Sequence, residues 1–137
     1  MKTLVIFYSY SGNTLIQAEK IAKQESADII RLRDIKPRSV IVTYSAGSFA
    51  AMKRKEAKLA EFNTDFSHYD KIIIAMPIWA GHPAPAINNV IACLPEGKEV
   101  ELIMTSGSGN SARTAEKTKE LITAKGCRVT NYTDIKA

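Results

Sequence analysis

The loop formed by residues 9–14 has the residue types of a phosphate-binding turn. It leads from an apolar run into a helical pattern, and a helix start offers unpaired N–H groups and the positive end of a dipole. Three hydroxyls add neutral donors, and Gly12 lets the backbone approach an anion. Without a lysine after Gly12 or an acidic residue for magnesium, the loop favours a terminal phosphate held without transfer, although a turn that only caps the helix fits equally well. The loop residues are Ser9, Tyr10, Ser11, Gly12, Asn13 and Thr14.

A second loop contains the only tryptophan of the chain. Trp79 follows an apolar run and lies among small residues and prolines, where an indole is suited to packing on a planar ring. A lone tryptophan more often belongs to the core, but Gly81 and the neighbouring prolines favour a rigid binding loop. The candidate binding residues are Pro77, Ile78, Trp79, Ala80 and Gly81.

A third loop, at residues 105–110, is rich in glycine and serine. Gly107, Gly109 and Ala112 fit the dinucleotide spacing G-x-G-x-x-A. That fingerprint belongs to the first strand of a βαβ pair, and only one strand is predicted to follow, so we reject it. A loop whose backbone N–H groups donate to the edge of a bound ring is the better interpretation of this glycine- and serine-rich segment. The candidates are Ser106, Gly107, Ser108 and Asn110.

Five strands are predicted around these loops. Three continuous apolar runs are typical of strands buried on both faces, and they cover residues 4–8, 72–76 and 100–105. Two mixed runs are typical of sheet edges, where charged side chains discourage further pairing, and they cover residues 29–33 and 127–132.

Helical patterns alternate with the strands, in residues 15–22, 86–94 and 112–122. This alternation predicts an α/β fold, a doubly wound sandwich whose five-stranded parallel sheet has the order 2-1-3-4-5 and helices on both faces. The 137 residues are expected to form a single domain, 1–137. Residues 34–68 are harder to interpret: 40–42 fit a short strand or a buried extended segment, and 48–62 fit a helix.

On these residues the chain resembles the short-chain flavodoxins. The family's phosphate motif, Ser/Thr-x-Ser/Thr-Gly-x-Thr, is matched by residues 9–14, and its Pro-x-Trp-x-Gly loop by residues 77–81. The resemblance implies a flavodoxin-like fold and non-covalent FMN, with residues 9–14 on the phosphate and Ile78 and Trp79 against the ribityl chain and ring. It also implies that residues 106–110 lie along the flavin edge. No residue is assigned as a catalytic acid, base or nucleophile, and no metal is expected.

The charge of the chain differs from the acidic flavodoxin carriers that it resembles, because its formal net charge is +5. The three loops, taken as residues 9–14, 77–89 and 105–113, contain no Asp or Glu, and they include His82 and Arg113. A cation about 6 Å from the reduced ring would raise its potential by something on the order of 100 mV. We therefore expect a less reducing flavin. An electron carrier is favoured, and a small FMN-dependent NAD(P)H or quinone-type oxidoreductase is the alternative.

Other classes fit the sequence less well. A phosphorylated receiver domain would need acidic residues where residues 9–11 and 77–79 stand, and a flavin-free binding module stays open. The basic run at residues 53–58 is typical of a solvated helix face, although it could dock an acidic redox partner, and nothing supports nucleic-acid binding. The expected partners are redox proteins or a small electron acceptor.

The expected compartment is the cytoplasm. The two cysteines, Cys93 and Cys127, do not have the spacing of a disulfide framework or a metal site, and no apolar run has the length of a membrane span.

Overall fold

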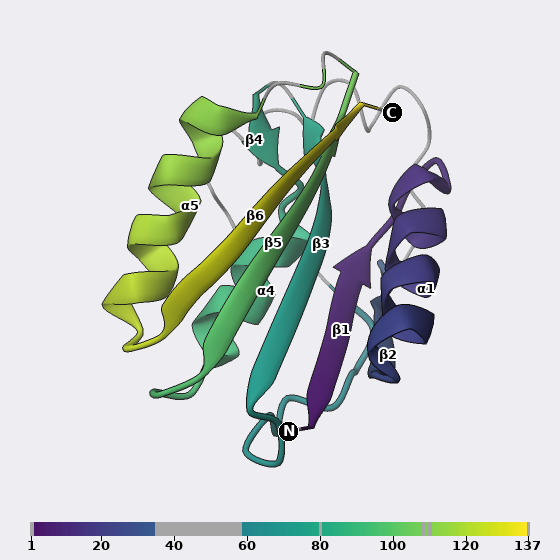
Figure 1. Cartoon of the computed structure of the whole chain (residues 1–137). Helices are drawn as coiled ribbons and strands as arrows, with labels where there is room; N and C mark the ends of the chain where they lie inside the picture. Colours follow the sequence, from purple (N-terminus) through teal and green to yellow (C-terminus); the bar gives the residue numbers. More distant parts are fainter. Residues whose placement is uncertain (1, 35–58, 80, 108, 110, 137) are drawn as a thin grey trace.

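Five parallel strands form the central sheet of the computed structural model, which describes residues 2–34, 59–79, 81–107, 109 and 111–136. Their spatial order is β2-β1-β3-β5-β6. When the two-residue strand β4 (His82–Pro83) is left out of the numbering, this spatial order becomes 2-1-3-4-5. The predicted doubly wound topology is therefore confirmed. The strands are β1 (Thr3–Tyr8), β2 (Asp28–Leu32), β3 (Lys71–Trp79), β5 (Glu99–Ser106) and β6 (Arg128–Lys136). All five run upward in Figure 1, so their carboxyl ends lie together at the top.

The apolar character of the inner strands explains their position. Every residue of β1 is buried, and residues 72–76 of β3 and 102–106 of β5 are buried too. The two predicted edge strands lie at the edges and consist mainly of exposed and half-buried residues, with only Leu32 at the end of β2 buried. This is the pattern expected where helices cover both faces of the inner strands.

Among the residues that the structure describes, three helices cover the sheet. They are α1 (Asn13–Glu25), α4 (Ala86–Cys93) and α5 (Ala112–Ala124). Ala18 and Ala22 of α1 pack with Val5 and Ile73 on one face of the sheet. Helices α4 and α5 pack on the other face, and α4 lies behind the sheet in Figure 1. Helices on both faces are therefore confirmed. No helix in the described ranges is long and apolar enough to cross a membrane.

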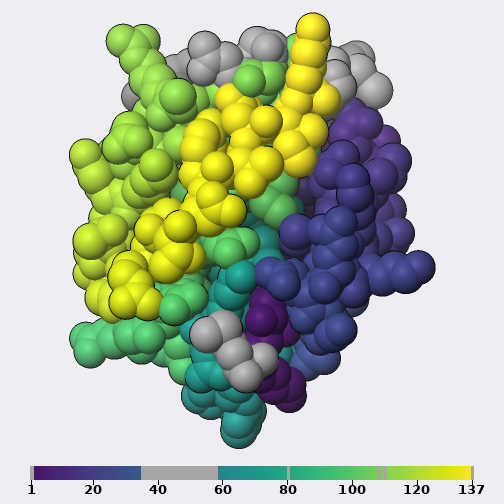
Figure 2. Space-filling model, viewed as in Figure 1, coloured from purple at the N-terminus to yellow at the C-terminus, as the bar shows by residue number. Residues whose placement is uncertain are grey.

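The face that carries α1 is only partly covered by the described residues. In Figure 2, β6 runs across this face as exposed surface beside α1. Polar groups replace a second apolar layer there, because Lys71 forms ion pairs with Glu101 (2.7 Å) and Glu25 (2.9 Å). Hydrogen bonds to Glu101 first, and then to Glu25, raise the pKa of Lys71 above its usual value.

Two sequence predictions are corrected by the strands. Trp79 was expected in a loop, but β3 continues through it and pairs with β4 (His82–Pro83), because Gly81 has a φ of 78° and closes a short turn. The last strand was expected to end at Tyr132, but it continues to Lys136 after a bulge opposite the step from Val100 to Glu101.

The segment between β2 and β3 gives a third correction. The helix expected over residues 48–62 is wrong for its described end, residues 59–62. Leu59 forms an antiparallel bridge with Asp34, and the Ala60 N–H donates to the Arg33 carbonyl over 2.8 Å, which requires extended backbone. The rest of that prediction, and the strand expected at residues 40–42, lie outside the described residues.

Candidate functional site

The loop between β1 and α1 is shaped by Ser9 and Gly12. The Ser9 Oγ accepts hydrogen bonds from the N–H groups of Gly12 (3.2 Å) and Leu15 (3.1 Å), so a side chain three to six residues upstream closes the turn. Gly12 has a φ of 99°, a left-handed conformation that favours glycine. Because Ser9 occupies the Leu15 amide, the amides of Asn13 and Thr14 are the donors of the first turn that remain for an anion at the carboxyl edge of the sheet.

The polar side chains of this loop have different surroundings. Ser11 and Asn13 are exposed, whereas Ser9 and Thr14 are buried. The Thr14 Oγ1 forms a hydrogen bond of 2.7 Å with the Thr105 Oγ1 at the end of β5. The described geometry thus gives the Ser9 and Thr14 side chains a role in positioning the loop, and direct donation from either hydroxyl to a ligand stays a prediction.

Aromatic side chains gather where β1 and β3 end. The Trp79 ring is edge-on to Tyr8 (centroids 5.7 Å apart, 79° between planes) and to Tyr10 (6.2 Å, 84°). Trp79 is half-buried against the core, while Tyr10 is 38% exposed. The Tyr8 hydroxyl donates a hydrogen bond to Asp34, which follows β2. The Trp79 ring therefore stands beside the first loop, to which Tyr10 belongs.

The β3–β4 turn completes this side of the site. Pro77 and Ile78 are half-buried, Gly81 is exposed, and Ala80 lies outside the described residues. The Ala84 N–H donates to the Pro77 carbonyl over 3.0 Å, which holds the turn against the end of β3.

The loop after β5 turns around Ser106 and Gly109. The Gly109 N–H donates to the Ser106 Oγ over 3.0 Å, and Gly109 has a φ of 70°. A Cβ added at Gly109 would lie 3.0 Å from the Cβ of Lys136, so this loop passes close to the end of β6. Gly107 is exposed, and Ser108 and Asn110 lie outside the described residues.

Two residues near the site were missed by sequence analysis. Asp134 of β6 accepts hydrogen bonds from the Ser111 N–H and the Ser111 hydroxyl, both over 2.9 Å, and the Tyr132 hydroxyl is hydrogen-bonded to the same Ser111 hydroxyl. Burial, as the largest cause, raises the pKa of Tyr132 above its usual value. The available signal was the two-residue spacing of Tyr132 and Asp134 on one strand, but the strand was expected to end too early.

The carboxyl edge of the sheet carries more negative charge than the sequences of the three loops predict. The three loops carry no carboxylate in the sequence, but Asp34 and Asp134 reach the same edge from the ends of the two outer strands. Each accepts a hydrogen bond from a hydroxyl of a neighbouring element. Residues 9–14, at the start of α1, nevertheless include no charged side chain, which suits a phosphate.

The open space at the three loops is compatible with a bound ligand. A Cβ added at Gly12, Gly81 or Gly107 would meet no atom within 4 Å. Each loop therefore leaves room for a group to approach its backbone. A phosphate at the start of α1 and a planar ring near Trp79 fit the residues that are described there.

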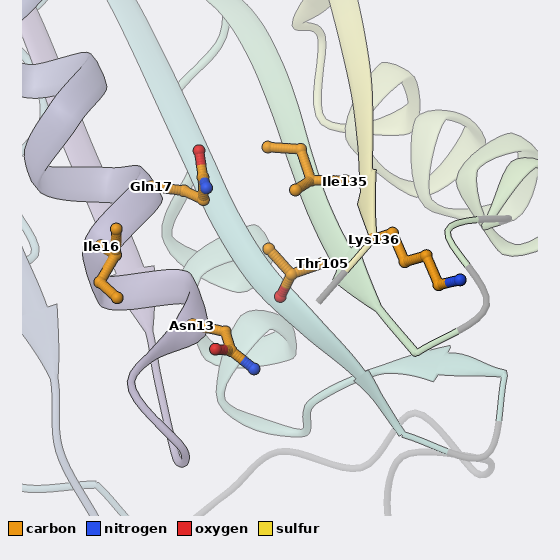
Figure 3. A pocket seen from close by; sticks show the side chains of 6 residues that line it. All are labelled: Asn13, Ile16, Gln17, Thr105, Ile135 and Lys136. Atoms are coloured by element: carbon orange, nitrogen blue, oxygen red, sulfur yellow. The ribbon is translucent and has the colours of Figure 1, made fainter.

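A small pocket adjoins the first loop on the α1 side of the sheet. It has a volume of about 120 Å³, far below the ~300 Å³ or more of a typical site for a large ligand. Figure 3 shows its lining side chains, which come from α1, β5 and β6. They are Asn13, Ile16, Gln17, Thr105, Ile135 and Lys136. The pocket is a side groove of the site and too small for a flavin ring.

Metal ligands do not gather in the described part of the chain, where no group of three His, Cys, Asp or Glu side chains could hold an ion. The site that the structure describes is therefore made of backbone amides, hydroxyls and aromatic rings.

Comparisons with known proteins agree with this architecture. A flavoprotein from Bacteroides eggerthii has a TM-score of 0.83 at 22% identity, with 96% of this chain and 86% of that chain covered. A flavoprotein in complex with FMN from Lactobacillus acidophilus has a TM-score of 0.79 at 24% identity, with coverage of 96% and 91%. A flavodoxin from Streptococcus pneumoniae has a TM-score of 0.60 at 12% identity, with coverage of 100% and 87%.

These likenesses show the fold. A search of curated proteins gives no match. The family model described as flavodoxin matches residues 2–132, almost the whole chain. Because this match covers more than half of the chain and the strand order agrees with it, this chain belongs to the flavodoxin family.

Proposed function

We propose that this protein binds FMN non-covalently and transfers electrons through it. The observation that carries the proposal is the start of α1, where Gly12 in a left-handed conformation and the Ser9 cap leave an open, locally neutral turn. Family membership and the FMN complex of the Lactobacillus relative support the choice of this cofactor.

The phosphate end of FMN fits the first loop. The amides at the start of α1 would donate to its oxygens, and the positive end of the helix dipole would stabilise its charge. The exposed Ser11 hydroxyl and the Asn13 side chain lie next to these amides. A dianion needs several donors and no nearby carboxylate, and residues 9–14 satisfy both conditions in sequence.

The ring end fits the aromatic side chains. The half-buried Trp79 ring is edge-on to the exposed ring of Tyr10, which belongs to the phosphate loop. Aromatic faces at this place can pack on the isoalloxazine, and the loop after β5 can offer backbone donors to its edge. FMN supplies the electron-transfer chemistry when bound, while the protein orients it, excludes water and sets the local charge.

The charge distribution supports a flavin of moderate potential. The net charge of +5, His82 of β4 and Arg113 of α5 favour a negatively charged reduced ring, whereas Asp34 and Asp134 at the edge oppose it. We therefore expect the reduction potential of the bound flavin to lie above that of strongly acidic carriers. The difference should be smaller than the three loops alone would produce, because the two aspartates partly offset their effect. The partner would be a redox protein or a small electron acceptor.

A second candidate is an FMN-dependent oxidoreductase that acts on NAD(P)H or a quinone. The observation in its favour is the absence of carboxylates from the three loops in sequence, since a higher potential suits two-electron acceptors. Anaerobic photoreduction distinguishes the two candidates. Uptake of one electron at a time favours the carrier, and uptake of two together favours the oxidoreductase.

Titration of the FMN-free protein tests the proposal. FMN should bind at one equivalent, and riboflavin, which lacks the phosphate, should bind at least about 100-fold more weakly because charge-assisted hydrogen bonds to the phosphate are lost. Flavin fluorescence and calorimetry would measure both affinities. A protein that ignores FMN, or that binds riboflavin equally well, would contradict the proposal.

A further inference from the structure

The strand β6 contributes a cluster that holds the loop after β5. The cluster consists of Ser111, Tyr132 and Asp134, which we call the Ser111 cluster. Building on the proposed function, we propose that Asp134, assisted by Tyr132, is a positioning residue for FMN: it acts through Ser111 to fix the loop after β5 before the flavin edge is bound.

The hydrogen bonds of the cluster are directed at both polar groups of Ser111. One oxygen of Asp134 accepts from the Ser111 N–H and the other from the Ser111 hydroxyl, each over 2.9 Å. The Tyr132 hydroxyl is bonded to the same Ser111 oxygen. Ser111 is only 3% exposed, so these bonds are shielded from competing water. Ser111, at the end of the loop, is thus held through its backbone and its side chain together.

The bulge in β6 places these side chains on the correct face. Val100 pairs with Val129, but Glu101 pairs with Asn131, so one residue of β6 is extra. As a result Tyr132 lies opposite Leu102 and Asp134 opposite Met104, on the face of the sheet that packs against α5. Without the extra residue both side chains would point to the α1 face, because a shift of one residue reverses a strand. Bulges often redirect a side chain beside a functional site.

A separate contact brings the same loop against β6. Gly109 approaches Lys136 so closely that a Cβ at Gly109 would lie 3.0 Å from the Lys136 Cβ. At the inner end of the loop, the Gly109 N–H is held by the Ser106 Oγ over 3.0 Å. The described residues of the loop are thus fixed at Ser106 by β5 and at Ser111 by β6.

This arrangement has a consequence for binding. A loop that is ordered before the ligand arrives does not lose conformational freedom on binding, so affinity increases without any new contact to the ligand. If only a fraction of the molecules has the competent loop, the apparent affinity falls by that fraction. Removal of Asp134 should therefore weaken FMN although Asp134 itself need not touch it.

The test compares Asp134→Ala, Asp134→Asn and Asp28→Ala in the full chain. Asp28 is the matched control, because it also lies on an edge strand and accepts a tyrosine hydroxyl, from Tyr69 over 2.8 Å, but at the amino end of the sheet. We expect about tenfold weaker FMN binding for Asp134→Ala, as for the loss of a charge-assisted hydrogen bond. Asp134→Asn, which can still accept from the Ser111 N–H, should retain most of the affinity, and Asp28→Ala should bind like the parent protein.

The spectrum of the bound flavin separates positioning from general destabilisation. At saturating FMN, the visible circular dichroism of Asp134→Ala should differ from that of the parent, and Asp28→Ala should not, while urea unfolding of each FMN-free variant reports stability. An Asp134→Ala variant with unchanged affinity and spectrum would overturn this inference and leave the proposed function intact. An Asp134→Asn variant as weak as Asp134→Ala would also overturn it, since charge would then matter more than position. A parent protein without FMN affinity would refute the proposed function itself.

Discussion

Two loops at the same edge of the sheet are held in different ways. The loop at residues 9–14 is closed by Ser9, whose hydroxyl accepts from amides three and six residues further along. The loop after β5 depends on Asp134, which is 23 residues beyond the Ser111 that it binds. The first loop is closed mainly by a neighbour in the sequence, with one long-range hydrogen bond from Thr14 to Thr105, whereas the second is held at Ser111 by a strand at the far edge of the sheet.

A loop closed mainly by its own residues depends chiefly on those residues, which suits a phosphate common to many ligands. A loop held by an edge strand can be adjusted through that strand, which suits the tuning of the flavin edge. Substitutions in the two loops should therefore differ in how strongly they weaken FMN binding.

The largest effect is expected from Gly12→Ala. The new Cβ would strain a backbone with a φ of 99° and enter the open space where the phosphate would lie. We expect about 100-fold weaker FMN binding, equivalent to about 2.7 kcal/mol. Gly97→Ala is the matched control, because Gly97 has a φ of 82° with equally open surroundings but precedes β5 at the opposite end of the sheet. Equal losses in both variants, measured by fluorescence titration, would contradict a phosphate at Gly12.

The next effect is expected from Ser9→Ala, which removes the acceptor of the Gly12 and Leu15 amides. Loss of a helix cap costs about 1 kcal/mol of stability. Urea unfolding of the FMN-free protein would measure it, and FMN affinity should fall about tenfold as the loop loses its shape. Full affinity in this variant would show that the first loop does not depend on its local cap.

A smaller effect on binding is expected from Thr14→Val. The buried Thr105 hydroxyl would lose its 2.7 Å partner and keep only the longer bond, 3.4 Å, that it donates to the Met76 carbonyl, which costs about 1 kcal/mol of stability. Thr14→Val with Thr105→Val should recover part of this loss, because the Thr105 hydroxyl, whose best partner is lost, is then also removed. FMN affinity should change only a few-fold. A loss as large as that of Gly12→Ala would instead make the Thr14 hydroxyl a direct phosphate donor.

The smallest effect concerns Tyr132 and pH. Burial raises its pKa in the folded protein, so the folded state holds the phenol proton more tightly than the unfolded state. The stabilisation is present below the ordinary tyrosine pKa of about 10 and declines as the pH rises above it. Unfolding of the FMN-free parent and of Tyr132→Phe should therefore differ most at neutral pH and converge above about pH 10. A difference that grows with pH would contradict a neutral Tyr132 in the Ser111 cluster.

The sequence was informative where the determining residues are close together. The apolar runs and their spacing identified the strand order, because burial on both faces leaves continuous apolar segments. The turn at residues 9–14 could be recognised because its glycine and hydroxyls are contiguous.

Long-range contacts could not be read in the same way. The contact of Asp134 with Ser111 depends on a bulge in β6, and no local pattern marks a bulge in an edge strand of mixed polarity. Trp79 was placed in a loop because prolines surround it, whereas the pairing of Trp79 with His82 extends the strand. The bridge between Asp34 and Leu59 likewise joins segments 25 residues apart, so the helix expected over residues 48–62 fails at its described end, residues 59–62.

A crystal structure of the FMN complex tests the central claim most directly. We predict that the phosphate lies at the start of α1, beside Gly12 and Asn13, and that the isoalloxazine packs near Trp79 with its edge toward Ser106 and Gly107. A phosphate bound elsewhere, or a ring distant from Trp79, would contradict the account.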